Sequence, residues 1–470
     1  MPDPAAIEMQ TPSPDRALVL HTTDLRVLDN RPLVEAHTRH ETVFSAIVID
    51  PHVFRRTAFD IPRFSARRVA WYLDAVRDLR RTYRAKGGDL VVRVGEPVAE
   101  VRRLVEQLGA SVIYAQAAKT DEERKTLRAL EEGVPQATCE WRWNDVLVDP
   151  PDWPVPPSSF PRSFTGFRKK FEQRCTVPQP LEAPQSFASL AVAPGEIPSL
   201  ESLGFTPLSI DSRSPIAPLE AGETGAWRQL DAYVWRDDRL RVYKETRNGM
   251  TGWGDSSKLS PYLALGLISP AAVFHQVLAY EAQRVANAST YWLRFELLWR
   301  EYFHAMALAC GNRLFHRSGV KRVHRPWSSD HATFVRWTEG RTGCAIVDAC
   351  MRELAATGFS SNRARQIAAS FLTHYLGIDW RWGAAWFEHH LIDHDPCSNW
   401  GNWQYVAGVG TGPRDRPMSM RFQAERYDAD GSFRTRWLPE TQDWATDALH
   451  RSHPEGPDAW VTPTAPYSAP

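Results

Sequence analysis

The chain has 470 residues, of which 43% are hydrophobic and 24% are charged. These values are typical of a soluble globular protein with two or three domains. Lys plus Arg and Asp plus Glu both number 56, so the zero net charge gives no general reason to expect a polyanionic partner, although a local basic patch would be enough to bind one. No apolar run approaches the roughly 18 residues that a membrane-spanning helix needs.

The N-terminus and the cysteines bear on the cellular compartment. Residues 1–16 lack the basic and apolar regions of a secretory signal, and we expect them to form a disordered leader. The six cysteines are scattered and include no CxxC pair, so neither a disulfide framework nor a zinc site is expected. We therefore predict a cytoplasmic protein that neither contacts a membrane nor binds a metal.

Residues 17–150 show a repeating strand–helix pattern. Short apolar runs bounded by polar turns predict buried parallel strands at 17–20, 45–49, 90–94 and 111–114. The main helical patterns between them span 66–86 and 99–108. This alternation predicts an α/β domain with a doubly wound parallel sheet. Because the phosphate-loop patterns GxGxxG and GxxxxGKS/T are absent, the fold alone does not indicate a nucleotide site.

The rest of the chain divides into three parts. Residues 151–219 are rich in Pro and Ser and predict a long surface linker, interrupted by one helix at 163–173. Residues 220–440 predict a larger, all-α domain, because apolar residues recur there every three or four positions. The clearest helices are expected at 289–309, 344–357 and 362–376. Residues 441–470 predict a flexible tail.

The segment Ser256-Ser257-Lys258-Leu259-Ser260-Pro261 places hydroxyl groups and an ammonium just before a helix that starts at proline. Such groups, together with the free N–H groups of a helix start, can hold an anion or a phosphate. The alternative is that Ser260 simply caps the helix. The residues alone leave both interpretations open.

Glu296, Trp299 and Arg300 lie three or four positions apart and share one face of a predicted helix. A carboxylate, an indole and a guanidinium that point inward would suit a pocket for a flat polar ring. The alternative is an ion pair between Glu296 and Arg300 on a solvated face.

A polar run from Asn362 to Gln366 opens an amphipathic helix, with Arg365 on the side that faces the core. A buried arginine needs a partner, and Asp393 is a candidate. Asp395 offers a further polar contact in the same loop. A metal site made of Asp393, His394 and Asp395 is the alternative, although no second His or Asp cluster completes it.

The chain has 19 tryptophans, which is an unusually high number. Indole rings fill protein cores, but they also stack on bases and relay single electrons. Trp327, Trp380 and Trp403 could form such a relay or could be ordinary core residues, and the sequence does not show whether they line up.

Together these clusters resemble the photolyase/cryptochrome family, over nearly the whole chain up to about Glu440. The resemblance is most specific between Tyr291 and Gly412. There, five motifs in the expected order indicate the DASH cryptochrome branch: STYWLRFELLWREYF, EGRTGCAIVDACMRELAATGF, NRARQIAASFL, GIDWRWGAAWFE and CSNWGNWQYVAGVG. The resemblance implies that the helical domain binds FAD, bent into a U.

The resemblance also assigns cofactor roles by motif position. Arg365 and Asp393 would form a salt bridge beside the flavin ring, and Asp395 would bond the ring or the ribose. Asn399 would lie at the flavin N5, where an Asn favours the fully reduced flavin. The residues that would hold the phosphates or line the cavity are Tyr243, Ser256, Ser257, Lys258, Leu259, Ser260, Arg300 and Asn362.

The implied activity is that of a deoxyribodipyrimidine photo-lyase, which splits cyclobutane pyrimidine dimers in blue light with an electron that reduced FAD donates and recovers. The lesion must leave the base stack to reach the flavin. Glu296 would hydrogen-bond the lesion, and Trp299 and Tyr405 would flank it. The family's electron relay from flavin to surface corresponds to Trp403, Trp380 and Trp327.

Tyr405 and Gln366 match the DASH branch, which prefers single-stranded DNA, whereas duplex-repairing relatives carry Trp and Met there. We therefore expect a monomer whose partner is UV-damaged, mainly single-stranded DNA. The expected DNA-contacting residues are Arg363, Gln366, Arg322 and Arg325. The alternative is a blue-light receptor or regulator that binds FAD and DNA without repair.

The segment Gln116-Ala117-Ala118-Lys119 departs from the family pattern at a second chromophore site. The glutamate that binds the antenna in DASH proteins falls at Ala118. We hypothesise that methenyltetrahydrofolate binds weakly or not at all, because this carboxylate is missing.

Overall fold

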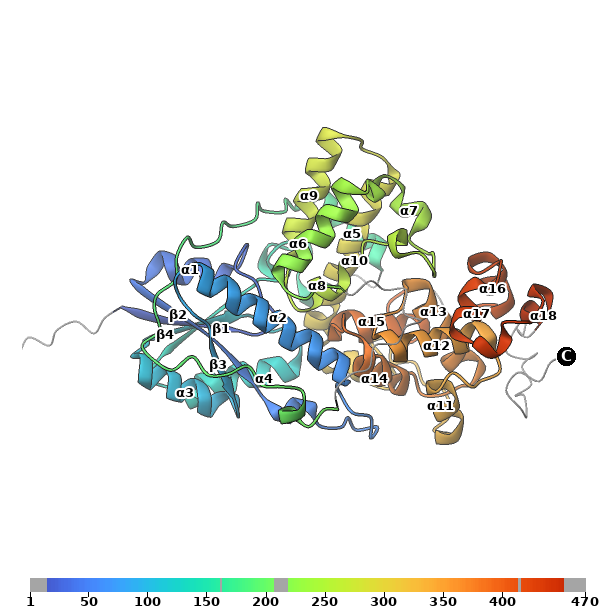
Figure 1. Ribbon diagram of the computed structural model, residues 1–470, viewed down its shortest axis with the longest axis horizontal. Coiled ribbons are helices and arrows are strands. Elements are labelled where there is room, and N and C mark those ends of the chain that lie inside the picture. The colour runs from blue at the N-terminus through green and yellow to red at the C-terminus, as the bar shows by residue number, and fades with distance from the viewer. Residues whose placement is uncertain (1–14, 161–162, 207–218, 413–415, 452–470) are drawn as a thin grey trace, which may run out of the picture.

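The computed structural model describes residues 15–160, 163–206, 219–412 and 416–451. Figure 1 shows an α/β domain packed beside a larger helical domain, as the sequence predicts. Most of the expected leader, with residues 1–14, lies outside the described residues. Within the described part of the chain, no helix is both long enough and apolar enough to cross a membrane.

The N-terminal domain is built on a five-stranded parallel sheet with the order β3-β2-β1-β4-β5. The strands are β1 (Arg16–His21), β2 (Thr42–Ile49), β3 (Val91–Val94), β4 (Val112–Gln116) and β5 (Thr138–Arg142). The first four match the predicted strands. The edge strand β5 was not predicted, because its sequence TCEWR is mostly polar and its residues are only half-buried or exposed.

Alternate residues of β1 enter two hydrophobic cores on opposite faces of the sheet. Ala17 and Val19 belong to the core on the side of α1 (Arg31–Arg39) and α2 (Ala66–Ala85), and Leu18 and Leu20 to the core on the side of α3 (Pro97–Leu108) and α4 (Asp121–Gly133). Figure 1 shows these helix pairs on the two faces of the sheet. The doubly wound arrangement therefore follows from strands that are apolar on both sides.

The linker contains one long helix and then follows the N-terminal domain. The helix α5 (Phe164–Arg174) lies where the sequence predicts it. Beyond it, the Phe187 ring packs 4.2 Å from the Tyr83 ring, and the Val92 N–H donates to the Pro194 oxygen at 2.7 Å. These contacts fix the segment to the surface of the sheet domain, along the path visible in Figure 1. Residues 207–218 of the predicted linker lie outside the described residues.

The second domain, in its described part, is built of helices joined by loops, with one isolated β-bridge between Ser328 and Ile378. Its helices are α6 (Glu223–Asp231), α7 (Tyr243–Thr246), α8 (Ser260–Ala264), α9 (Pro270–Gln283), α10 (Ala288–Cys310), α11 (His331–Thr338), α12 (Ala345–Thr357), α13 (Asn362–Ser370), α14 (Trp380–His390), α15 (Pro396–Val406), α16 (Met420–Tyr427), α17 (Ser432–Trp437) and α18 (Thr446–Arg451). The three helices expected at 289–309, 344–357 and 362–376 are present.

Two local predictions for this domain need correction. The helix expected at 362–376 ends as α-helix at Ser370 and continues as a π-helical turn over Phe371–Tyr375. In this turn the Thr373 hydroxyl donates to the Ala369 oxygen at 2.8 Å, a bond that competes with regular helix geometry. The flexible tail expected from residue 441 instead begins with ordered chain, because α18 packs with Leu449 buried. Residues 452–470 lie outside the described residues.

Two buried carboxylates of the helical domain bind backbone and indole N–H groups of the preceding half of the chain. Glu223 accepts from the Val27 N–H at 2.9 Å. Glu301 accepts from the Leu147 N–H at 2.9 Å and from the Trp153 indole at 3.0 Å. These contacts fix how the two domains meet, and they place the N-terminal domain against α10.

Candidate FAD site in the helical domain

A cavity of about 670 Å³ lies in the helical domain, which is within the range of cofactor-sized pockets. Its walls come mainly from α7, α8, α10, α13 and α15. Eighteen of the residues singled out from the sequence line it: Tyr243, Ser256, Ser257, Lys258, Leu259, Ser260, Glu296, Trp299, Arg300, Asn362, Arg363, Arg365, Gln366, Asp393, Asp395, Asn399, Trp403 and Tyr405. Four others do not: Trp327, Trp380, Arg322 and Arg325.

The loop before α8 presents a cation and hydroxyl groups to the cavity. Lys258 adopts a left-handed backbone conformation with φ of 54°, and its ammonium lies 2.9 Å from the Ser256 hydroxyl. Burial lowers the pKa of Lys258 to about 8, and a bound phosphate would favour its charged form. Ser260 does not cap α8: the cap position is Leu259, and no side chain accepts a hydrogen bond there. The simple capping interpretation is therefore wrong.

Arg365 and Asp393 form the ion pair that the sequence suggested, with Nη2 2.7 Å from Oδ2. Arg365 is held from its other side, because its Nε donates to the Ser360 oxygen at 2.9 Å. The Asp393 side chain is 1% exposed, and its second oxygen, Oδ1, is buried with no hydrogen-bond partner among the described residues. A buried carboxylate oxygen of this kind needs a donor, and a ligand N–H or O–H in the cavity would supply one. The donor set therefore fits a polar ring system such as that of FAD.

Asp395 fixes the start of α15. It caps the helix by accepting from the Ser398 N–H at 2.9 Å, and His304 Nε2 lies 3.4 Å from the same carboxylate. Burial alone would raise the pKa of Asp395, but the neighbouring His304, Arg300 and Lys119 side chains hold it well below its usual range. An ionised Asp395 is thus fixed in the cavity wall.

Asn399 follows one turn later, and its side-chain nitrogen donates to the Ala384 oxygen at 3.0 Å. This bond leaves the side-chain oxygen as the group that can accept a hydrogen bond from a ligand.

The metal site considered for Asp393, His394 and Asp395 is wrong, because the three side chains face different partners. Asp393 pairs with Arg365, His394 lies 4.0 Å from Glu388, and Asp395 meets His304. Within the described residues, one group of three possible metal ligands has its ligand atoms within 4.8 Å of one another: His304, Asp395 and Cys397. The positive charges of Lys119 and Arg300 act on this carboxylate and disfavour a bound cation.

Glu296 does not pair with Arg300 of the same helix, so the intrahelical alternative is also wrong. Its partner is Arg247, whose Nη2 lies 2.9 Å from Glu296 Oε1. Burial raises the pKa of Glu296, and the nearby Arg247 opposes the rise. Arg300 instead reaches Asp145 of the N-terminal domain, with Nη2 3.5 Å from Oδ2. The two charged residues of this helix face therefore serve different walls of the cavity.

Trp299 and Tyr405 meet edge to face with ring centroids 6.1 Å apart. One face of Trp299 is stacked on Phe164 of α5, at 3.8 Å and an interplanar angle of 11°. Gly412 lies against Tyr405: a Cβ at this position would come within 2.7 Å of the ring, and its φ of 114° also favours glycine. The aromatic pair is thus held by residues on both sides.

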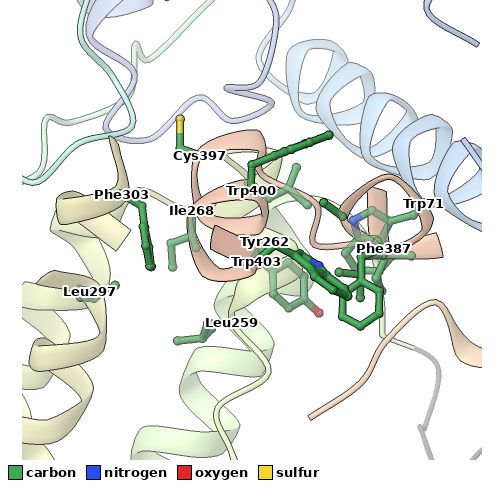
Figure 2. Packing of buried hydrophobic residues seen from close by; sticks show 14 of the residues in the cluster. Trp71, Leu259, Tyr262, Ile268, Leu297, Phe303, Phe387, Cys397, Trp400 and Trp403 are labelled. Atoms are coloured by element: carbon green, nitrogen blue, oxygen red, sulfur yellow. The ribbon is translucent and has the colours of Figure 1, made fainter. Parts of the chain in front are cut away.

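Only one of the three predicted relay tryptophans lines the cavity. Trp403 packs against Phe387 at 5.0 Å and Trp337 at 6.2 Å, as the close view in Figure 2 shows for Phe387. Trp380 is fully buried and contacts Trp400 at 5.7 Å. Trp327 is 8% exposed. The order of an electron path through these rings stays a prediction.

The predicted DNA-contacting residues fall into two groups. Arg363 and Gln366 line the cavity, and Arg363 donates to the Gln366 oxygen and to the Asn248 oxygen, both at 3.1 Å. Arg322 is exposed, and Arg325 lies 5.7 Å from the Trp327 ring outside the cavity. The first group is thus held at the cavity wall, and the second belongs to a separate loop.

Several residues of this site were missed in the sequence. Arg247 follows Tyr243 by four positions, so helical spacing was a signal that could have found it. Phe164 and Asp145 come from the linker and the N-terminal domain, and no local pattern connects them with the cavity. Their contacts with Trp299 and Arg300 join residues more than 130 positions apart.

A doubly wound sheet domain joined to a helical domain with this cavity defines a photolyase-type FAD protein. The family model described as DNA photolyase matches residues 17–185, and the model described as the FAD binding domain of DNA photolyase matches residues 292–470. The chain is 43% identical to a cryptochrome DASH of Natronomonas pharaonis, over 91% of this chain and 90% of that protein. It is 42% identical to a cryptochrome DASH of Danio rerio, over 90% and 83%.

The solved structures agree with these relatives. The structure of a Synechocystis cryptochrome superposes with a TM-score of 0.90 at 39% identity, covering 94% of this chain and 92% of that one. A class III photolyase of Agrobacterium tumefaciens superposes with a TM-score of 0.82 at 29% identity, covering 95% and 91%. The chain therefore belongs to the cryptochrome DASH branch of the photolyase/cryptochrome family. Its helical domain is the family's FAD-binding domain.

Proposed function

We propose that this protein is a blue-light-driven lyase that repairs cyclobutane pyrimidine dimers, with a preference for single-stranded DNA. The observation that carries the proposal is that one cavity is lined both by the proposed cofactor residues and by Glu296, Trp299 and Tyr405. A lesion that contacts these three side chains would lie directly beside the cofactor. Bound reduced FAD would supply the light-driven electron and take it back when the ring has split.

The polar residues of the cavity have separate tasks in this proposal. Arg365 and Asp393 hold the cofactor ring, and the free Asn399 oxygen accepts a hydrogen bond from an N–H group of the ring. A fully reduced flavin carries an N–H at N5 and an oxidised flavin does not, so this orientation of Asn399 favours the reduced form. Lys258 and Ser256 hold the phosphates.

The lesion side of the cavity acts by hydrogen bonding and ring contact. Glu296 hydrogen-bonds the lesion, and Trp299 and Tyr405 contact its faces. Each base stacked on an aromatic side chain gains roughly 1–3 kcal/mol, and extrusion from a duplex costs a few kcal/mol. A Tyr at position 405, with a smaller ring than Trp, gains less from stacking. The weaker stacking therefore no longer offsets the cost of extruding the lesion from a duplex, but it is enough for a lesion in a single strand, where that cost is smaller.

The test is light-dependent repair of a thymine dimer in matched single-stranded and double-stranded oligonucleotides, with the protein kept reduced. We expect repair of the single strand in blue light, little repair of the duplex and none in the dark. Absence of repair in both substrates would overturn the proposal and favour a light receptor without lyase activity.

A further inference from the structure

Buried charged groups connect the N-terminal domain with the wall of the cavity. Lys119 follows β4 and Asp145 follows β5, and their side chains form an ion pair. These side chains are only 4% and 8% exposed. Arg300 of α10 approaches the same carboxylate at 3.5 Å and also donates to the Asp145 backbone oxygen. One carboxylate of the N-terminal domain is thus shared by its own lysine and by an arginine that lines the cavity.

The same lysine acts on a second residue of the cavity wall. Burial would raise the pKa of Asp395, but His304, Arg300 and, to a smaller extent, Lys119 hold it well below its usual range. Asp395 begins α15, and Figure 2 shows Cys397, two residues later, pointing toward the ribbon of the N-terminal domain. Burial raises the pKa of the Cys397 thiol well above its usual value, and the Lys119 charge partly opposes this rise. The ammonium therefore lies where the two domains meet at the start of α15.

A buried ammonium is costly unless it is paired, so its presence at this contact needs a physical reason. The pairing with Asp145 offsets part of this cost, but it does not by itself explain why the ion pair lies at this contact. The neighbours of Lys119 supply the reason. With Lys119 present, the Asp145 carboxylate is shared by two cations, and Arg300 stays 3.5 Å from it while donating to the Asp145 backbone oxygen. Without Lys119, the Asp145 carboxylate would lose its paired ammonium and would draw the Arg300 guanidinium toward itself, away from the cavity.

We propose that Lys119 is a positioning residue of the FAD site, which acts through Asp145 to keep the Arg300 guanidinium at the cavity wall. The proposal rests on FAD binding in this cavity and is independent of repair. It gives the N-terminal domain a role in cofactor retention, at the residue next to Ala118. Failure of the repair assay would leave this proposal untouched.

The test compares the FAD-loaded Lys119→Met variant with the unmodified protein. The rate of FAD release after dilution is followed by the rise of free-flavin fluorescence, and the visible flavin spectrum is recorded before dilution. We expect release at least tenfold faster and a less structured flavin band. The matched control is Lys125→Met, because Lys125 is 69% exposed and pairs with Asp121 on α4, away from the cavity. Release from K119M within twofold of the unmodified rate would overturn the proposal.

Two further variants separate positioning from simple stabilisation. Lys119→Arg keeps the charge and should restore slow release. The double variant K119M/D145N leaves neither charge of the pair buried alone, and it removes the carboxylate that would draw Arg300 away from the cavity. It should therefore release FAD at close to the unmodified rate, and release at least tenfold faster than that rate would contradict the proposal. A purely structural role predicts a lower melting temperature of the FAD-free protein with an unchanged release rate in every variant, and that result would contradict the proposal.

Discussion

Arg247 Nη2 lies 2.9 Å from Glu296 Oε1 in the wall of the cavity, so the acid that we propose binds the lesion is already engaged by a cation before DNA arrives. Two opposing effects act on this carboxyl. Burial raises its pKa and favours the protonated form, whereas the guanidinium lowers it. A lesion that binds the ionised Glu296 carboxylate has to compete with Arg247 for it. Alternatively, Glu296 becomes protonated, separates from Arg247 and donates a hydrogen bond to the lesion.

Glu296→Ala is expected to slow the repair of a single-stranded dimer roughly tenfold, which corresponds to about 1.4 kcal/mol, the range of one hydrogen bond. Glu296→Gln keeps a donor and should lose much less. Because burial raises the pKa of Glu296, repair that uses the protonated acid should fall as the pH rises through that pKa, and E296Q should not show this fall. Single-turnover repair rates across a pH series provide the measurement. An E296A rate equal to that of the unmodified protein would remove Glu296 from the mechanism.

The Arg365–Asp393 pair should decide how tightly FAD is held. Asp393→Ala leaves the Arg365 charge without its partner and should weaken FAD binding by about 3 kcal/mol, or roughly 100-fold. Asp393→Asn should be intermediate, because it keeps a hydrogen-bond acceptor. Flavin content after gel filtration and FAD titration of the FAD-free protein measure the effect. Asp379→Asn, which disturbs an Arg–Asp contact outside the cavity, should retain FAD; loss of FAD there as well would point to general destabilisation.

The sequence predicted the parts of this protein that depend on local patterns. Apolar runs located four of the five strands, and the motifs located half of the cavity-lining residues. The edge strand Thr138–Arg142 was not predicted, because a strand at the edge of a sheet does not require an apolar sequence. The partners of Glu296 and Arg300 were not predicted, because they lie far away in the chain. Arg247 is 49 positions from Glu296, and Asp145 is 155 positions from Arg300. Such pairings depend on how helices pack, which spacing along one helix does not reveal.

The position of Ala118 bears on light harvesting. The hypothesis that Ala118 stands in place of the antenna glutamate predicts that the purified protein shows no strong absorption band near the folate maximum above the absorption of the flavin itself. Ala118→Glu restores a carboxylate and should increase the uptake of added methenyltetrahydrofolate. Absorption spectra before and after incubation with the folate test both statements. A strong folate band in the unmodified protein would contradict the hypothesis.

Trp403 and Trp400 are neighbouring buried indoles of α15, and only Trp403 lines the cavity. If Trp403 is the first electron donor beside the cofactor, as we propose, Trp403→Phe should slow the photoreduction of oxidised FAD at least tenfold. Trp400→Phe is the matched control and should change the rate little, although Trp400 contacts Trp380. The decay of the oxidised-flavin band under blue light, with a thiol as the final reductant, gives the rate. If W400F is as slow as W403F, electrons also pass through Trp400.

Glu301 makes the contact between the two domains sensitive to pH. Burial raises its pKa from the usual 4.5 to about 7, although the Leu147 N–H and the Trp153 indole favour the charged form. An acid whose pKa is raised by folding contributes its full stability below the unfolded pKa, and this contribution is lost as the pH rises through the folded value. The difference corresponds to roughly 3 kcal/mol at most, lost between about pH 4.5 and 7.

Glu301→Gln cannot ionise, so its melting temperature should fall less between pH 5 and 8 than that of the unmodified protein. Its side-chain oxygen can still accept from the same N–H groups. The exposed Glu132→Gln serves as the control and should follow the unmodified protein.

Asp145 affects the pH dependence of stability in the opposite direction. Burial would raise its pKa, but Lys119, His304 and Arg300 lower it to about 2. Its contribution to stability is therefore lost only as the pH falls below about 3.8. Thermal unfolding of FAD-loaded protein across a pH series extended below about pH 3.8 distinguishes the two groups. An equal slope between pH 5 and 8 for E301Q and the unmodified protein would show that Glu301 does not set the pH dependence.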